Sequence, residues 1–349
     1  MSNFMINEAQ NYIEKIRHEY IQKHSFEQER DELIAENNIE KRDVKGYHGR
    51  EILELLQNAD DAYQKSIDVG SKPECELIVT IKYLDNILTV TNTGTSFDKD
   101  GIKAIVQGNN SPKSGKYIGN KGTGFRSILN WARAVRIFSG EFNIEFSEDI
   151  AKKEFEKLRN LPQIQKQLNK KSNLYFPMLA IPKWIDNDKY NNATTIEVDI
   201  DPQKLNDNYS VEKQIDNIDL RILLFLPNIS QIEIITHKGK IIYKREVFQG
   251  DIPTVLLQKI VDGDIEIQEK FYLFNKKIEN MIKEDGVLKD IILSIAVPHD
   301  FESFKRGYLY SFFPLLDTES PFNCVMHASY ALGDHRNTIK ERMNINILF

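Results

Sequence analysis

This 349-residue chain has few cysteines, no long apolar runs and no excess of positive charge. Its two cysteines, Cys75 and Cys324, lie far apart in the sequence and match no metal-binding spacing. This excludes a disulfide-stapled secreted scaffold and a cysteine-based zinc site, and it suits a reducing cytoplasm. The first residues also lack the basic segment and apolar core of a signal peptide. We therefore expect a cytoplasmic protein.

No apolar run is long enough to cross a membrane as a helix. The longest, at residues 222–227 and 291–298, fall far short of the roughly 20 residues that such a helix needs. Lysine and arginine number 46 against 52 aspartates and glutamates, and the net charge of −6 argues against general nucleic-acid binding. A hydrophobic fraction of 41% and a charged fraction of 28% indicate a globular protein, and the length favours two domains.

The most informative segment is residues 54–62, which read ELLQNADDA. Spacings of four and three residues place Glu54, Asn58 and Asp61 on one face of a predicted helix. The opposite face is apolar, so the helix can pack while its polar stripe faces a cavity. That apolar face consists of Ile52, Leu55, Leu56, Ala59 and Tyr63. Alone, such a stripe is more often a solvated helix face, and two further motifs change that interpretation.

The second motif ends a β-rich run at Asn92-Thr93-Gly94, a turn signal that precedes a helical pattern from Asp98. The third motif spans residues 108–127 and holds five glycines and three lysines before a helix predicted at residues 128–132. Glycine allows a ligand to approach the backbone, and free N–H groups at a helix start favour phosphate. An ordinary surface loop is the alternative, and the segment is not a Walker P-loop.

These three motifs, in this order, resemble those of the GHKL superfamily of ATPases, which includes gyrase, the ninety-kilodalton heat-shock chaperone, histidine kinases and MutL. The family's second glycine box, Gly-x-x-Gly-x-Gly, is matched in full at residues 119–124. The helix sequence QNADDA, at residues 57–62, is similar to that of the sacsin and NO VEIN branch of this superfamily. The resemblance is strong over residues 45–130 and looser beyond. Asn92 stands where most of the superfamily has an aspartate, and Ser96 where a glycine is usual.

The resemblance implies an α+β fold, an α/β sandwich of the Bergerat type. Its mixed, mostly antiparallel sheet would be covered by helices and followed by a second α/β domain. We expect an N-terminal helical segment at 1–45, an ATP-binding domain at 46–205 and a transducer-like domain at 206–349. Within the ATP-binding domain, a lid is expected at 107–122 and a charged, solvent-exposed helical insertion at 148–171. Independently of the resemblance, the residue pattern predicts a hairpin with strands at 76–83 and 87–91 and a turn at 84–86, and a helix at 211–225. Because proteins of this branch are much longer, the chain is expected to be either a fragment, truncated in its second domain, or a compact single module.

The resemblance also assigns roles to individual residues. Glu54 would be the general base of ATP hydrolysis, Asn58 the Mg²⁺ ligand through its side-chain oxygen, and Asp61 the holder of a metal-bound water. The nucleotide would further contact residues of the two glycine-bearing motifs and a late strand: Asn92, Gly94, Lys113, Gly119, Lys121, Gly122, Thr123, Gly124, Phe125 and Thr194. Arg306 and Arg336 are candidates for sensing the terminal phosphate, although a surface arginine is the commoner explanation for each.

Three functions compete. The first is an Mg-dependent ATPase with slow turnover, in which lid closure or homodimerisation acts on a protein partner or downstream domains. It would be chaperone-like or serve bacterial stress or antiviral defence. The second is a nucleotide-gated sensor or interaction module with little or no turnover. The third, a histidine kinase, is rejected, because His18 precedes Asn58 by 40 residues and leaves no room for a two-helix dimerisation domain.

Overall fold

The computed structural model describes most of the chain, with several gaps. The described residues are 3–24, 33, 36, 38, 40, 49–71, 75–107, 124–159, 175–187, 189–190, 193–284, 287–302, 304, 308–311, 313–320 and 322–328. The lid expected at 107–122 therefore lies outside them except for Gln107, as do residues 160–171 of the expected insertion.

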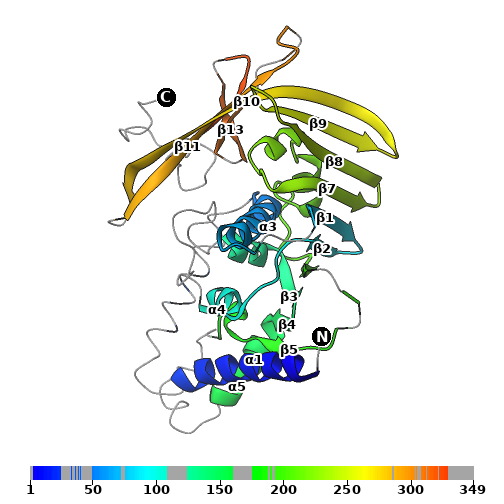
Figure 1. Cartoon of the computed structure of the whole chain (residues 1–349). Helices are drawn as coiled ribbons and strands as arrows, with labels where there is room; N and C mark the ends of the chain where they lie inside the picture. Colours follow the sequence, from blue (N-terminus) through cyan, green and yellow to red (C-terminus); the bar gives the residue numbers. More distant parts are fainter. Residues whose placement is uncertain are drawn as a thin grey trace.

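One large mixed sheet of 14 strands organises the described part of the chain (Figure 1). Its strand order is β13-β12-β14-β11-β10-β9-β8-β7-β1-β2-β6-β3-β4-β5. The pairs β1–β7 and β12–β14 are parallel, and the other neighbours run antiparallel. The strands are β1 (Leu77–Leu84), β2 (Ile87–Asn92), β3 (Ala132–Ser139), β4 (Phe142–Ser147), β5 (Lys183–Trp184), β6 (Thr194–Ile200), β7 (Ile229–Thr236), β8 (Gly239–Phe248), β9 (Thr254–Val261), β10 (Asp264–Glu284), β11 (Val287–Pro298), β12 (Tyr308–Ser311), β13 (Phe313–Glu319) and β14 (Val325–Ala328).

Helices gather beside the strands of the first half of the chain, and Figure 1 shows α3 next to β1 and β2. Helix and strand content together confirm the expected α+β class. The α-helices are α1 (Asn3–Lys23), α3 (Glu51–Asp68), α4 (Lys99–Gln107), α5 (Glu148–Arg159) and α7 (Val211–Asp216); the 3-10 segments are η2 (Gly124–Asn130), η3 (Met178–Ala180) and η4 (Leu220–Leu224). Among the described residues, none of the helices has the length and apolar character to cross a membrane.

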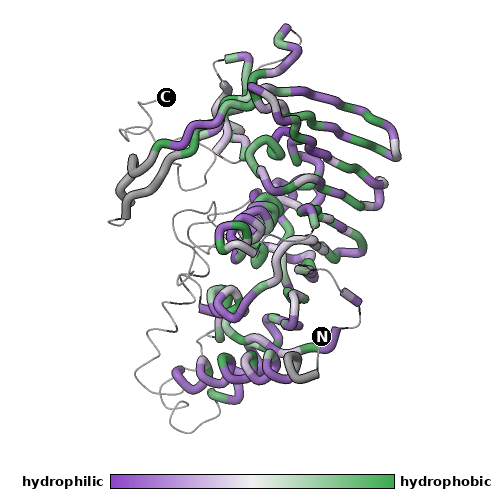
Figure 2. Tube along the Cα trace, viewed as in Figure 1, coloured by the Kyte–Doolittle hydropathy of each residue, from purple (hydrophilic) through white to green (hydrophobic). Residues whose placement is uncertain are grey.

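The β1–β2 hairpin forms as the alternating pattern predicts. Leu77, Val79 and Ile81 are fully buried on one face of β1. Asp85 and Asn86 turn the chain with φ values of 51° and 61°, a left-handed conformation that aspartate and asparagine tolerate better than most residues. Similar alternation continues along β7 to β10, where hydrophobic and hydrophilic residues follow one another (Figure 2). Buried side chains are few in the described part of β8 to β10, where Tyr243, Val255, Leu257, Phe271 and Leu273 reach the core, and other apolar side chains such as Ile265 stay exposed.

The sheet continues across the domain boundary expected near residue 206. The strand β7, which follows that boundary, pairs in parallel with β1, and Ile232 lies opposite Val79. In the described residues after 206, the helical elements are the short α7 and η4, and eight strands follow them. This unit is richer in strands than the expected α/β domain, and the boundary itself stays a prediction.

Two predicted helices are wrong in detail. The helix expected at residues 128–132 is the 3-10 segment η2, which ends at Asn130 before β3 begins at Ala132. The helix expected at residues 211–225 is interrupted between α7 and η4, because Asp219 is extended and its side chain accepts from the backbone N–H of Arg221. Periodicity located the helical turns but not their breaks.

The insertion expected to be solvent-exposed has a buried face. Its described helix, α5, places Ala151, Phe155 and Leu158 in a small core with Phe176 and Ile181. The charged residues of α5 occupy the rest of its surface. The high charge of this segment hid an amphipathic helix.

Candidate functional site

The helix α3 buries four carboxylates. Glu51 is 0% exposed, Glu54 and Asp61 are each 3% exposed, and Asp60 is 2% exposed. The apolar face expected on this helix is buried as well: Ile52, Leu55, Leu56, Ala59 and Tyr63 belong to the main core. Buried charge is costly unless it is paired or hydrogen-bonded. The partners of these carboxylates therefore determine what α3 does.

Glu54 lies directly against the third motif. A Cβ atom added to Gly124 would lie 2.1 Å from Glu54 Oε2 and 3.0 Å from Glu54 Cδ, so a side chain at residue 124 would require the buried Glu54 carboxylate to move. Gly124 is the first residue of η2, and its neighbour Phe125 is buried in the core. The structure thus brings the predicted base and the last glycine of the box into contact.

Gly94 of the second motif packs beside α3. A Cβ atom there would lie 2.9 Å from Leu77 Cδ1 and 3.3 Å from Tyr63 Cδ2. The N–H of Gly94 donates to Asn92 Oδ1 at 3.1 Å. The glycine therefore lets the end of β2 approach the helix, and it fixes the orientation of the Asn92 amide.

A row of polar side chains lies where the apolar face of the sheet ends, beside the turn at Gly94. Asn92 lies opposite Thr194, and Thr194 lies opposite Ser139, in the registers of β2–β6 and β3–β6. Thr194 Oγ1 and Ser139 Oγ are 2.7 Å apart, and Thr194 Oγ1 also donates to the Thr95 carbonyl at 3.2 Å. The buried hydroxyl oxygen of Thr95 has no hydrogen-bond partner among the described residues. A polar end of a core face, with one unused hydroxyl, fits a ligand that forms hydrogen bonds.

Some of the predicted site residues lie in the described part of the chain and others do not. Glu54, Asn58 and Asp61 lie on α3, with Asn58 half-buried, and Gly124 contacts Glu54. Phe125 follows Gly124 in η2, Gly94 lies beside Tyr63 of α3, and Asn92 and Thr194 pair across β2 and β6. The other predicted residues fall outside the described part of the chain: Lys113, Gly119, Lys121, Gly122, Thr123, Arg306 and Arg336.

Sequence reasoning missed Glu51, the first residue of α3. Its Oε1 accepts from Asn130 Nδ2 at 2.9 Å, and its Oε2 accepts from Gln214 Nε2 at 2.6 Å and from the Gly49 N–H at 2.9 Å. Burial raises the pKa of Glu51 to about 7 against the effect of these donors. Glutamate at a helix start is common, so the sequence carried no signal for this role.

Asp60 was missed as well, although it lies within the motif. Its carboxylate accepts from the backbone N–H of Asn228 at 2.9 Å and from Asn228 Nδ2 at 3.1 Å. Asn228 immediately precedes β7, so this contact ties α3 to the second half of the sheet. Asp60 is a structural anchor, whereas its neighbour Asp61 belongs to the predicted polar stripe.

Arg126 of the third motif links η2 to two other segments of the chain. Its Nη1 donates to Glu40 Oε2 at 2.7 Å and its Nη2 donates to the carbonyl of Ile105 in α4 at 2.9 Å. Burial raises the pKa of Glu40, and the guanidinium opposes that rise. Arg126 and Glu40 are each largely buried in this ion pair, and the bond to the Ile105 carbonyl ties the start of η2 to α4.

The described part of the fold offers no metal site in which protein carboxylates supply most of the ligands. In the residues that the structure describes, no three His, Cys, Asp or Glu side chains gather as a metal site. The predicted Mg²⁺ site uses one amide oxygen, from Asn58, with phosphate oxygens and water completing the shell. Such a site needs no carboxylate cluster, so the Mg²⁺ prediction stays a prediction.

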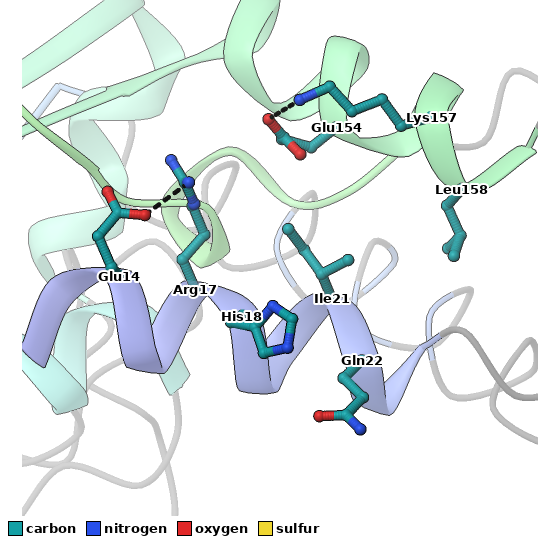
Figure 3. A pocket seen from close by; sticks show the side chains of 8 residues that line it. All are labelled: Glu14, Arg17, His18, Ile21, Gln22, Glu154, Lys157 and Leu158. Atoms are coloured by element: carbon teal, nitrogen blue, oxygen red, sulfur yellow. Dashed lines mark hydrogen bonds and ion pairs between the residues drawn. The ribbon is translucent and has the colours of Figure 1, made fainter. Parts of the chain in front are cut away.

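A cavity of about 680 Å³ lies between α1 and α5, apart from α3 (Figure 3). Its cations are already paired: Arg17 with Glu14 at 2.6 Å, and Lys157 with Glu154 at 2.7 Å. None of the described residues of the three motifs lines it. The lining residues are Glu14, Arg17, His18, Ile21, Gln22, Glu154, Lys157 and Leu158.

The contact between Glu54 and residue 124 predicts a specific dependence between two substitutions. Gly124→Ala should lower the free energy of unfolding by about 1–3 kcal/mol, because the new Cβ collides with a buried carboxylate. In a Glu54→Ala background, the same change should cost less than about 1 kcal/mol, because the obstacle is gone. Urea unfolding measures both, with Gly250→Ala as the control at an uncrowded glycine. An equal cost in the two backgrounds would contradict the contact.

The anchor at Asp60 predicts a dependence of stability on pH. Burial raises the pKa of Asp60 from 3.8 to about 7, and nearby Asp61 raises it further, against the hydrogen bonds from Asn228. The folded state therefore binds the proton more tightly, so this contribution to stability is complete below about pH 4 and is lost as the pH rises through about 7. Relative to Asp60→Asn, the wild-type chain should lose on the order of 2 kcal/mol of unfolding free energy between about pH 5 and pH 8. Urea unfolding across that range tests this, and a difference between the two proteins that does not change with pH would refute it.

Comparison with known proteins adds a limited similarity. The chain is 36% identical to the Protein NO VEIN of Arabidopsis thaliana over 98 residues, which make up 27% of this chain. The match covers 3% of that much longer protein. The chain matches no protein-family model. These findings link part of the chain loosely to NO VEIN-like proteins.

Proposed function

We propose that this chain is a GHKL-type ATPase module of the Bergerat fold that binds Mg-ATP at α3 and hydrolyses it slowly. The observation that carries the proposal is the contact between Glu54 and Gly124. It places a buried carboxylate against the last glycine of a box that is suited to phosphate. Gly94 lies beside Tyr63 of α3, and the polar row Asn92–Thr194–Ser139 crosses three strands at the end of β2.

In this proposal, the stripe on α3 supplies the chemistry near the phosphates. Mg²⁺, when bound, would neutralise phosphate charge. Glu54 would orient the attacking water and accept its proton as the bond from the terminal phosphorus to the leaving ADP breaks. Asn58 would hold the metal through its side-chain oxygen, and Asp61 would hold a water beside it or form a local hydrogen bond. Burial of Glu54 and Asp61 keeps bulk water away from both carboxylates.

The polar row forms the base pocket in the same proposal. Asn92, Thr194 and the unused Thr95 hydroxyl offer hydrogen bonds to a purine, and Ser139 holds Thr194 in place. Ser139 Oγ also accepts from the Phe97 N–H at 2.8 Å, so it joins the second motif to β3. This pocket is built from three strands and one turn, which makes it rigid before a ligand arrives.

A nucleotide-gated sensor with little turnover is the second candidate, and one observation favours it. The third motif opens into η2, a 3-10 segment of seven residues, and not into the α-helix that was expected. A short segment offers fewer aligned N–H groups to a phosphate than a full helix does. Phosphate binding would then depend on the lysines and glycines of residues 108–123, which lie outside the described part.

Action on a protein partner, dimerisation on ATP binding and a role in stress or antiviral defence are proposals for the whole protein. The match to the NO VEIN protein covers too little of that protein to carry them. The six-residue helix α7 and the strands after it are the described elements through which a nucleotide-dependent change could reach downstream domains. A cytoplasmic location likewise stays a prediction.

Replacing the proposed base separates the two candidates. Glu54→Ala should retain ATP binding and lose at least about 100-fold in phosphate release, because the water loses its base. Glu302→Ala is the control, since Glu302 is exposed and far along the chain. Phosphate release and ATP binding are measured on all three proteins. Binding without release in the wild-type chain would support the sensor, and no binding would refute the nucleotide site.

The amide of Asn92 predicts a relaxed choice of base. Its Oδ1 accepts from the Gly94 N–H, which leaves one lone pair of that uncharged oxygen and the Nδ2 donor to face a ligand. A carboxylate there would accept from the adenine amino group more strongly, because it is charged and presents no donor. Asn92→Asp should raise the preference for ATP over GTP by about 10-fold, measured by competition binding. An unchanged ratio would place Asn92 away from the base.

A further inference from the structure

The two ends of η2 are held by two carboxylates that are neighbours on α3. Glu54 lies against Gly124, the first residue of η2, and Glu51 accepts from Asn130, its last residue. Residues three apart on a helix lie side by side, so η2 runs back along α3 between these two contacts. Two contacts, one at each end, fix both the position and the direction of the segment.

Glu51 is itself held by the segment that leads into the second half of the chain. Gln214 of α7 donates to Glu51 through Nε2, and its Oε1 accepts from the Ile52 N–H at 3.4 Å. The carbonyl of Tyr209 accepts from Gln214 Nε2 and from Trp131 Nε1, each at 3.2 Å. The residue that follows η2 therefore shares an acceptor with the glutamine that holds Glu51.

The position of Glu51 is not explained by a need for stability alone. The site is closed to solvent: Glu51 is 0% exposed, Asn130 is 9% exposed and Gln214 is 9% exposed. Replacing such a network by well-packed apolar side chains is often neutral for stability, whereas hydrogen bonds of fixed length and direction specify one arrangement. A buried carboxyl with three donors is suited to holding a segment in one place.

We propose that Glu51 is a positioning residue of the α3 site, which fixes η2 through Asn130 so that Gly124 stays against the carboxylate of Glu54, and which α7 holds in place through Gln214. This inference rests on the proposed function, because it takes Glu54 as the group that acts on the nucleotide. In this proposal Glu51 does not contact the nucleotide. It acts through η2.

The test compares Glu51→Ala with Asp60→Ala. Both residues are buried carboxyls on α3 that accept from side-chain amides, but Asp60 is joined to Asn228 and not to η2. Glu51→Ala should bind ATP with little change in KM and lose about 10-fold in kcat, while Asp60→Ala should lower thermal stability and leave kcat within about 2-fold. Glu51→Gln should restore most of the turnover, because its amide can reform the bond once Asn130 turns its own amide over.

Asn130→Ala removes the same hydrogen bond by removing its donor on η2. This variant replaces Glu51→Ala in the test if Glu51→Ala does not fold. It should reproduce the loss in kcat. Amide hydrogen exchange over residues 124–131 gives a second readout that needs no nucleotide. The protection there, which includes the Trp131 N–H bond to the Ile128 carbonyl, should fall in Glu51→Ala and Asn130→Ala and not in Asp60→Ala.

The outcomes separate this inference from the proposed function. Equal effects of Glu51→Ala and Asp60→Ala on kcat and on exchange over residues 124–131 would overturn the positioning role. If the wild-type chain neither binds nor hydrolyses ATP, the proposed function fails, and hydrogen exchange alone decides whether Glu51 holds η2. A loss of turnover without faster exchange in η2 would also overturn the proposal, because the loss would then come from elsewhere.

Discussion

Buried carboxyl groups on one helix are the constraint on which this fold depends. Four carboxyl groups of α3 are at most 3% exposed, and each needs polar partners that water no longer supplies. Glu51 finds its partners in η2 and α7, and Asp60 finds its own at the start of β7. The Glu51 contacts hold η2 against the first turn of the helix, whereas the Asp60 contacts tie the middle of the helix to the second half of the sheet.

The two halves of the sheet meet at the parallel pair β1 and β7, close to one of these carboxyl groups. Beside that parallel pair, the apolar face of α3 covers the core, and Asp60 holds the segment that enters β7. Arg50, just before α3, places its guanidinium over the ring of Phe313 in β13, 5.1 Å from the ring centre. One helix thus touches strands from both halves of the chain. A change in the position of α3 would therefore reach strands on both sides of residue 206.

Residue spacing and turn residues correctly predicted those elements whose formation depends on neighbours close in the sequence. The amphipathic α3, the β1–β2 hairpin with its Asp85-Asn86 turn and the strand at Thr194 follow from residue spacing and turn chemistry. The break between α7 and η4 was missed, since it depends on the capping bond from Asp219 and not on periodicity. The burial of α5 was missed because its apolar residues are few and its partners, such as Phe176, come later in the chain.

The candidate site shows the same division at the level of single residues. Glu54, Asn92 and Gly124 were found because their spacing and their order are informative within short segments. Glu51 and Asp60 were not found, because what distinguishes them is a partner 79, 163 or 168 residues away. A glutamate in the first turn of a helix looks the same in sequence whether it is solvated or fully buried. The groups that we expect to contact a ligand are recognisable from short motifs, whereas the groups that hold them in place depend on the fold. That is why the residue most suited to positioning Glu54 emerged from the packing of η2 and not from the sequence.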